Sequence, residues 1–309
     1  MPRPCTCDND ECPLCKRYYN DPRYRAIWGG DESNAFIVVP SRGHNVSGIS
    51  SPRPWKHRVT AAIPHHESFD TLPVIVELLR LQTVRPYILV IDTGSSRDTC
   101  DSIEMLRAND LEIHYLKSHG WQHPSEPVAA AMDLALTLCQ TKYLFCTHSD
   151  VFPRRRDLIE MLLSHDAPVV GYEMSDRSHV TDQWKGMVSH TATLLHMPTM
   201  RRIGAAWSIL RACELLDISA ASAGWPDTET CLNIILRRHG ITPNLIGAEH
   251  NGERHVDANI DHVRSLSSVR LYAGDDEVKK RTEWIALALA EAQERIKSWR
   301  RHASTVRVR

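Results

Sequence analysis

The fold is decided by residues 58–96, RVTAAIPHHESFDTLPVIVELLRLQTVRPYILVIDTGSS. The stretch begins with a short apolar strand that we expect to end at Pro64. A helix capped by Asp70 is predicted over 70–83, and a buried strand over 86–92. Parallel strands need a crossover of about a dozen residues or more, and this helix supplies one. The stretch therefore predicts a parallel sheet.

The same alternation of strands and helices continues after this stretch. Helices are predicted over 96–110 and 125–139, and strands over 111–118 and 142–148. Repeated crossovers of this kind imply a sheet covered by helices on both faces. Ligands of such sheets bind outside the carboxyl ends of the strands. Three strands end there in polar groups, which we expect to line one crevice: Pro64-His65-His66-Glu67, Asp92-Thr93-Gly94-Ser95 and His148-Ser149-Asp150.

The composition excludes several classes of protein. The formal net charge of the 309 residues is −1, so no overall field favours nucleic acid, and no nucleic-acid partner is expected. No apolar run approaches the roughly 20 residues that cross a bilayer, and the N-terminus lacks the apolar core of a signal peptide. We therefore expect a cytoplasmic protein without a transmembrane segment. The basic C-terminal tail leaves a peripheral membrane contact open.

Four cysteines crowd into the N-terminal sequence CTCDNDECPLC with the spacing C-x-C-x4-C-x2-C. Four thiolates can close a tetrahedral shell around zinc, and a segment this short needs such a centre to fold. The predicted ligands of a structural Zn²⁺ are Cys5, Cys7, Cys12 and Cys15. A cysteine-rich tail without metal and a redox role are the alternatives.

The chain is predicted to have four parts: a cysteine-rich zinc knuckle (1–30), a linker (31–57), the α/β domain (58–273), and a C-terminal amphipathic helix with a basic tail (274–309). The helix has an apolar face at helical spacing, formed by Ile285, Ala288, Leu289, Ala292, Ile296 and Trp299.

Two common nucleotide-binding motifs are absent from the sequence. It contains no G-x-x-x-x-G-K-[ST] loop, and no G-x-G-x-x-G follows the first strand of the α/β domain. A P-loop kinase and a dinucleotide dehydrogenase are therefore disfavoured. If a nucleotide binds, its phosphates need another partner, and a divalent cation is the simplest one.

Four motifs in order make residues 58–245 resemble the GT-A glycosyltransferases, specifically the inverting family 2. These are Ile63-Pro64, Asp92-Thr93-Gly94-Ser95, His148-Ser149-Asp150 and GWPDTETCLNIILRRHGI. The resemblance implies a GT-A, Rossmann-like, mostly parallel sheet flanked by helices. It also implies a metal-dependent transferase that moves a hexosyl or N-acetylhexosaminyl group from a nucleotide-diphosphate sugar to an acceptor hydroxyl, with inversion. The acceptor (saccharide, lipid or protein) is left open.

The resemblance also gives residues their roles. Asp92 would contact the nucleoside of the donor, and the same site would include Pro64, Glu67, Gly94, Ser95 and Trp121. His148 and Asp150 stand at the metal motif, and His255, with His262 as second choice, would supply a further ligand. Because an imidazole suits Mn²⁺ better than Mg²⁺, manganese is expected. Glu229 would be the base that deprotonates the acceptor, with Asp227 as second choice.

Some positions depart from the pattern of the family. Thr93 replaces a second acidic residue, and Met132-Asp133 replaces an Arg-Asn pair. These departures support an alternative, a zinc-containing binding module with an inactive transferase core. A sugar-nucleotidyltransferase is a further alternative, although no G-x-G-x-R loop follows the first strand of the α/β domain. Asp150 could also simply cap a following helix.

Overall fold

The computed structural model describes residues 37–40, 56–68, 70–117, 125–173, 186–217, 227–248, 254–263 and 275–306. The four N-terminal cysteines and Trp121 lie outside these ranges, so the zinc knuckle and the role of Trp121 stay predictions. Along the residues described, no helix combines the length and the apolar character needed to span a bilayer.

A central sheet positions every part of the site. Its strands are β1 (Ile37–Pro40), β2 (Val59–His65), β3 (Tyr87–Asp92), β4 (Leu111–Lys117), β5 (Tyr143–Cys146), β7 (Val169–Glu173), β8 (Thr193–His196) and β9 (Asn244–Ala248). Their order is β1-β4-β3-β2-β5-β8-β7-β9. The four strands β4, β3, β2 and β5 are parallel, β8 is antiparallel to both neighbours, and β1 is antiparallel at the edge. The mostly parallel sheet of the prediction is confirmed.

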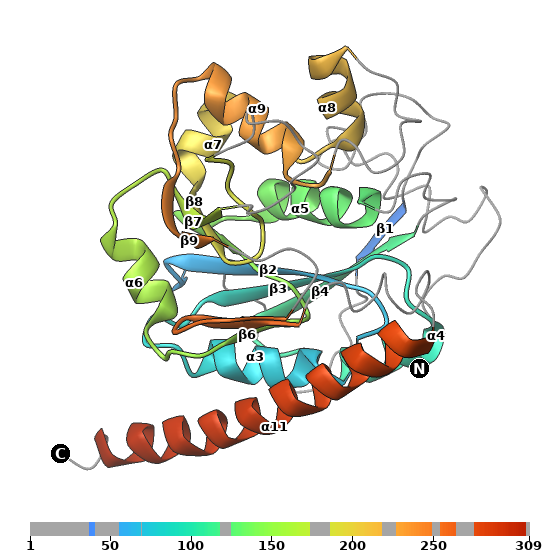
Figure 1. The fold of residues 1–309 in the computed structure, drawn as a ribbon, viewed down its shortest axis with the longest axis vertical. Helices are drawn as coiled ribbons and strands as arrows, with labels where there is room; N and C mark the ends of the chain where they lie inside the picture. Colours follow the sequence, from blue (N-terminus) through green and yellow to red (C-terminus); the bar gives the residue numbers. More distant parts are fainter. Residues whose placement is uncertain are drawn as a thin grey trace.

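Helices cover both faces of this sheet (Figure 1). One hydrophobic core holds residues of α3 (Leu72–Arg80), α4 (Arg97–Glu104), α6 (Leu158–Ser164) and α11 (Asp275–Val306). The other holds residues of α5 (Glu126–Leu138), α7 (Met197–Ile203), α8 (Ile209–Leu216) and α9 (Thr230–Arg238). The strands alternate between the two cores because successive side chains point to opposite faces. The predicted apolar face of α11 packs on the first core, which confirms that expectation.

A second, three-stranded sheet forms beside the end of β5. It consists of β6 (Val151–Pro153), β10 (His255–Val256) and β11 (Ile260–His262), in the order β10-β11-β6. The polar stretch from 255 to 262 supplies two of these strands. Its strands have only two and three residues, too few for a period of two to be recognised in the sequence. Their pairing places His262 opposite Val151, next to Asp150.

β2 continues through Pro64 to His65, so the predicted strand end is wrong. β5 pairs with β2 only as far as Cys146, opposite Ala62, and Thr147 N then donates to Ala62 O. Beyond that point the described pairing with β5 ends. The missing N–H of Pro64 therefore costs no ladder hydrogen bond.

Two further predictions of local structure need correction. Thr71, not Asp70, occupies the N-cap position of α3, and the Asp70 carboxylate accepts a hydrogen bond from Thr71 N at 3.0 Å. The predicted linker 31–57 contains β1, which pairs antiparallel with β4. Four residues among Gly, Ser and Asn are too few for an alternating pattern to be recognised. The partner strand lies far along the chain, so the sequence does not reveal the pairing either.

Candidate active site

The carboxyl ends of β2, β3 and β5 lie at one edge of the sheet, as predicted. The parallel register places His65 opposite Asp92, and Ala62 opposite Cys146 at the end of β5. Thr71 Oγ1, at the start of α3, donates a 2.5 Å hydrogen bond to the carbonyl of Ser149. The segment after β2 is thus joined to the segment after β5.

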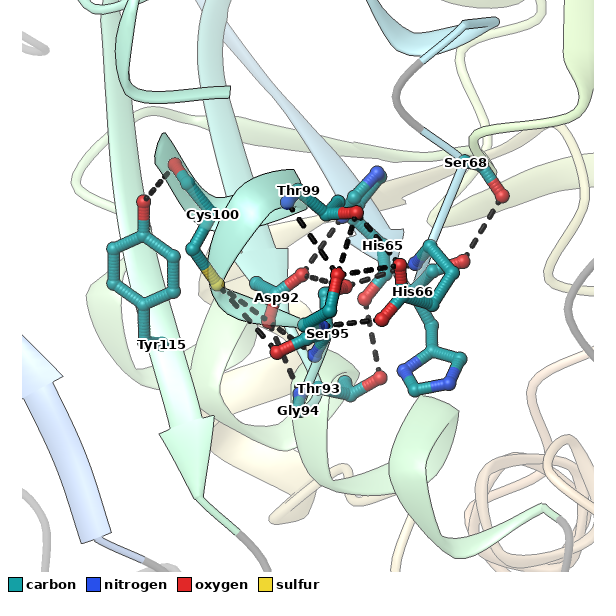
Figure 2. A network of polar contacts seen from close by, with 12 residues as sticks. His65, His66, Ser68, Asp92, Thr93, Gly94, Ser95, Thr99, Cys100 and Tyr115 are labelled. Carbon is teal, nitrogen blue, oxygen red and sulfur yellow. Dashed lines mark hydrogen bonds and ion pairs between the residues drawn. The ribbon is translucent and has the colours of Figure 1, made fainter. Parts of the chain in front are cut away.

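Asp92 organises the turn after β3 (Figure 2). Its Oδ1 accepts hydrogen bonds from Gly94 N at 3.0 Å and Ser95 N at 2.9 Å. Its Oδ2 accepts bonds from Ser95 Oγ at 2.5 Å and His65 Nδ1 at 2.8 Å. Burial opposes ionisation, but the bonds from His65 and Ser95 outweigh it and hold the pKa of Asp92 below its usual value. Gly94 has φ +101°, a conformation that a side chain would strain.

Glu67 joins this turn to the start of α4. Its N–H donates to Ser95 Oγ at 2.8 Å, and its carboxylate accepts bonds from Ser96 and from Thr99 Oγ1, the latter at 2.6 Å. Burial raises the pKa of Glu67, but the bonds from Thr99 and Ser96 outweigh it, so the pKa is lowered. The predicted donor residues Pro64, Glu67, Asp92, Gly94 and Ser95 therefore lie together.

The burial and hydrogen bonds of Asp92 bear on its predicted contact with a nucleoside. Asp92 is 1% exposed, and both of its oxygens are used by the turn. Its contact with a nucleoside stays a prediction. His65, which was not in the predicted donor set, is also buried, and within the described part of the chain its Nε2 has no hydrogen-bond partner.

Asp150 does not cap a helix. It is followed directly by β6, and the next helix, α6, has Asp157 at its N-cap position. The backbone carbonyl of Asp150 accepts a 3.0 Å bond from Val263 N, which holds the end of β11 beside it. The side chain of Asp150 is therefore kept at the carboxyl edge of the sheet, 5% exposed.

His262, rather than His255, contacts Asp150. His262 Nε2 lies 3.6 Å from Asp150 Oδ1, and the rings of His262 and His148 are 6.2 Å apart. His255 lies opposite His262 in the β10–β11 pair, but its Nε2 is 3.5 Å from Asp257 Oδ2. Of the two predicted downstream ligands, His262 is the one that the structure brings to the metal motif.

The chemistry of these side chains fits a divalent cation. Burial, followed by the neighbouring His190, lowers the pKa of His148 to about 3, so its imidazole is neutral at pH 7. The buried Nε2 of His148 has no hydrogen-bond partner among the residues that the structure describes. Two atoms that bind one cation at about 2.1–2.2 Å lie roughly 3–3.6 Å apart, which the His262–Asp150 distance meets. As the side chains stand, the described residues contain no group of three or more His, Cys, Asp or Glu arranged to hold a metal ion.

The predicted base, Glu229, is connected to these residues by His190. Glu229 is the N-cap residue of α9 and is 5% exposed. Its Oε1 accepts a hydrogen bond from His190 Nδ1. The ring of His190 lies 4.1 Å from the ring of His148. The chain of contacts from Glu229 through His190 to His148 joins the base to the metal motif.

Asp227, the second choice for the base, has a different environment. Its Oδ1 accepts a 2.5 Å bond from Ser125 Oγ and a 2.7 Å bond from Thr228 N. These bonds join the start of α5 to the start of α9. Asp227 thus connects the starts of two helices, whereas Glu229 contacts His190.

His190 was missed by the sequence reasoning. It lies in VSHTATLLH, just before β8, in no recognisable motif. It reaches the site because β8 pairs antiparallel with β5, and that strand order cannot be read from the sequence. The only sequence signal was a histidine in a short polar segment between apolar ones.

Asp133 helps to position His190 through Trp207. Trp207 N donates a 2.6 Å hydrogen bond to Asp133 Oδ1, and the Trp207 ring meets the His190 ring edge-on at 5.9 Å. Burial raises the pKa of Asp133 to about 7. The acidic residue that stands in place of the family's Asn thus fixes the loop that packs on His190.

Asp133→Asn is expected to change how stability depends on pH. The folded pKa of about 7 exceeds the ordinary value of 3.8, so the folded state holds the proton more tightly. Stability should therefore fall as pH rises from about 4 to 7, and then level off. The variant lacks this fall, so its free energy of unfolding relative to the wild type should improve by about 2 kcal/mol between pH 5 and pH 8. Urea denaturation at both pH values measures it, and an equal difference at the two would contradict it.

Comparisons with known proteins give the following picture. None of the protein-family models and none of the curated proteins matches the sequence. Among solved structures, the chain is similar to the mannosyltransferase PcManGT from Pyrobaculum calidifontis in complex with GDP-Man and Mn²⁺ (TM-score 0.43, 11% identity, 84% of this chain and 78% of that one). It is also similar to S. aureus TarS (0.44, 13%, 76% and 43%) and to a mycobacterial protein (0.41, 11%, 67% and 67%).

Proposed function

We propose that the chain is a glycosyltransferase that moves a sugar from a nucleotide-diphosphate donor to an acceptor hydroxyl, with a divalent cation in the site. One observation carries the proposal. A buried carboxylate, Glu229, lies one imidazole away from the His148 and Asp150 pair at the carboxyl edge of a mostly parallel sheet. A base beside a cation site is what sugar transfer from a diphosphate needs.

His148, Asp150 and His262 would hold the cation. It would neutralise the charge that develops on the leaving diphosphate, which is the largest electrostatic requirement of the reaction. Two imidazoles with one carboxylate favour Mn²⁺ over Mg²⁺, because Mg²⁺ prefers oxygen ligands.

The chemical step follows from the position of the base. The acceptor hydroxyl gives up its proton to the base as its oxygen bonds to the anomeric carbon. The bond from that carbon to the diphosphate oxygen breaks, and the electron pair leaves with the diphosphate. A single displacement of this kind inverts the anomeric carbon. Glu229 is the first candidate for the base, because its partner His190 contacts His148 of the metal motif, whereas Asp227 is bonded to Ser125 at the start of α5.

The nucleoside would bind near the turn after β3. Asp92 and Glu67 fix this turn by accepting hydrogen bonds from six backbone or hydroxyl groups of Gly94, Ser95, Ser96 and Thr99. A surface held in this way needs little reordering when a ligand binds. The identities of the nucleobase of the donor, the sugar and the acceptor are left open.

The two departures from the family pattern have structural roles in this chain. Thr93 donates from both N and Oγ1 to the carbonyl of His65, at 2.9 and 3.1 Å. Asp133 binds Trp207 N. Both residues stabilise the site, so their presence does not by itself favour an inactive core.

Thermal unfolding with UDP, GDP, CDP and dTDP, each with and without Mn²⁺, tests the proposed function. We expect one of the four to raise the midpoint by several degrees, and only with Mn²⁺. A ligand at about 100 times its dissociation constant stabilises the folded state by roughly 2.7 kcal/mol. Mn²⁺ alone and each nucleotide with EDTA are the controls. If none of the four shifts the midpoint, the binding module with an inactive core becomes the better interpretation.

A further inference from the structure

His190 and Glu229 form a carboxylate–imidazole pair inside the candidate site. His190 Nδ1 donates to Glu229 Oε1, and the His190 ring is held between the rings of His148 at 4.1 Å and Trp207 at 5.9 Å. Three contacts from three different segments fix the orientation of one imidazole. A ring that only filled space beside β5 would not need all three of these contacts.

The hydrogen bond determines which nitrogen of His190 carries the proton. An ionised carboxylate can only accept, so Nδ1 must donate to Glu229. A neutral imidazole then has its lone pair on Nε2, which is the form of the ring that accepts a proton. The carboxylate also stabilises the imidazolium that forms, as in Asp–His pairs of hydrolases.

The positions of the two side chains assign them different tasks. The Glu229 side chain is 6% exposed and the His190 side chain is 13% exposed. Glu229 also occupies the N-terminus of α9, where the helix dipole stabilises a negative charge. Glu229 already accepts a hydrogen bond from the ring of His190, which places it behind that ring as its partner.

We propose that Nε2 of His190 takes the proton of the acceptor hydroxyl, and that Glu229 holds and stabilises the imidazole behind it. This rests on the proposed transferase function and revises its base. The acceptor oxygen bonds to the anomeric carbon, the bond to the diphosphate breaks with its electron pair, and the acceptor proton moves to His190. His190 is the catalytic residue of the pair and Glu229 the positioning one.

The same lone pair could instead bind the cation, and the experiment separates the two uses. Three variants are compared with the wild type: His190→Ala, His190→Asn, which keeps a donor toward Glu229, and His165→Ala as a matched control at an exposed position. The measured rate is that of nucleoside diphosphate release from a sugar nucleotide, with water as the acceptor. The sugar nucleotide is chosen to contain the nucleoside diphosphate that raises the unfolding midpoint. Imidazole is then added to each variant.

We expect both His190 variants to lose about 10²-fold or more in kcat, the usual contribution of a general base. The midpoint shift with nucleotide and the Mn²⁺ concentration that gives half of it should stay within twofold of the wild type. This retained shift also shows that the variants fold. Free imidazole should restore at least tenfold of the lost rate in His190→Ala and change nothing in His165→Ala.

Three results would overturn the inference in distinguishable ways. A His190→Asn protein with nearly wild-type kcat would mean that the residue only holds Glu229. A His190 variant that needs much more Mn²⁺ would make the imidazole a cation ligand. A wild-type protein that binds none of the nucleotides and releases no diphosphate would remove the proposed function and the inference together.

Discussion

Asp150→Ala is expected to abolish the Mn²⁺-dependent binding of nucleoside diphosphate and to lower kcat by about 10³-fold or more. Asp150 is the only carboxylate among the three side chains proposed to hold the cation, and the other two are imidazoles, which carry no negative charge. Without it, a cation would bring two positive charges into the site with no anionic ligand. Loss of several kcal/mol of charge stabilisation at the leaving diphosphate corresponds to this rate. The midpoint shift with nucleotide and Mn²⁺ measures binding, and diphosphate release measures the rate.

Asp157→Ala is the matched control for this variant. Asp157 is a carboxylate on the same segment, but it pairs with Arg155 at 2.7 Å and lies beyond β6. It should keep the Mn²⁺-dependent shift. The two histidines give a finer comparison: His262→Ala should raise the Mn²⁺ concentration needed, and His255→Ala should not. A full shift in Asp150→Ala would place the cation elsewhere.

The fold could be predicted from the sequence where apolar runs were long and regular. The β2–α3–β3 unit was recognised because seven and six buried residues flank a nine-residue helix with an apolar face. The short strands β1, β10 and β11, of four, two and three residues, were not recognised. Pairing with another strand, rather than their own pattern, makes them strands, and β1 and β11 pair with strands far along the chain. The end of β2 was predicted wrongly at Pro64 for a related reason. Whether a strand can contain this proline depends on where the neighbouring strand β5 ends.

The candidate site was predictable where residues follow strands directly. Asp92, His148 and Asp150 come at the ends of β3 and β5, and a parallel sheet brings such ends to one edge. His190 precedes an antiparallel strand, β8, so no rule about the carboxyl ends of parallel strands could find it. The choice between His255 and His262 depended on the register of β11 against β6, which a short polar hairpin does not reveal.

Glu229→Gln is expected to lower kcat by about 10²–10⁴-fold while leaving the nucleotide-induced shift of the midpoint nearly unchanged. The glutamine keeps the size of the side chain but removes its charge. Its amide can donate to His190 Nδ1, which would move the ring proton to Nε2 and leave no lone pair there. If the carboxylate itself were the base, the change would remove the proton acceptor directly. Either way the loss falls on the chemical step and not on donor binding.

Asp227→Asn separates this effect from general damage to the start of α9. Asp227 lies two residues away and binds Ser125, so its loss should lower the unfolding midpoint and change kcat by less than about tenfold. Added imidazole then decides between the two forms of the mechanism. It should rescue His190→Ala but not Glu229→Gln, because free imidazole replaces a missing ring and cannot replace a missing charge. If Asp227→Asn lost the rate and Glu229→Gln kept it, the assignment of the base would have to be exchanged, and the His190–Glu229 pair would be structural.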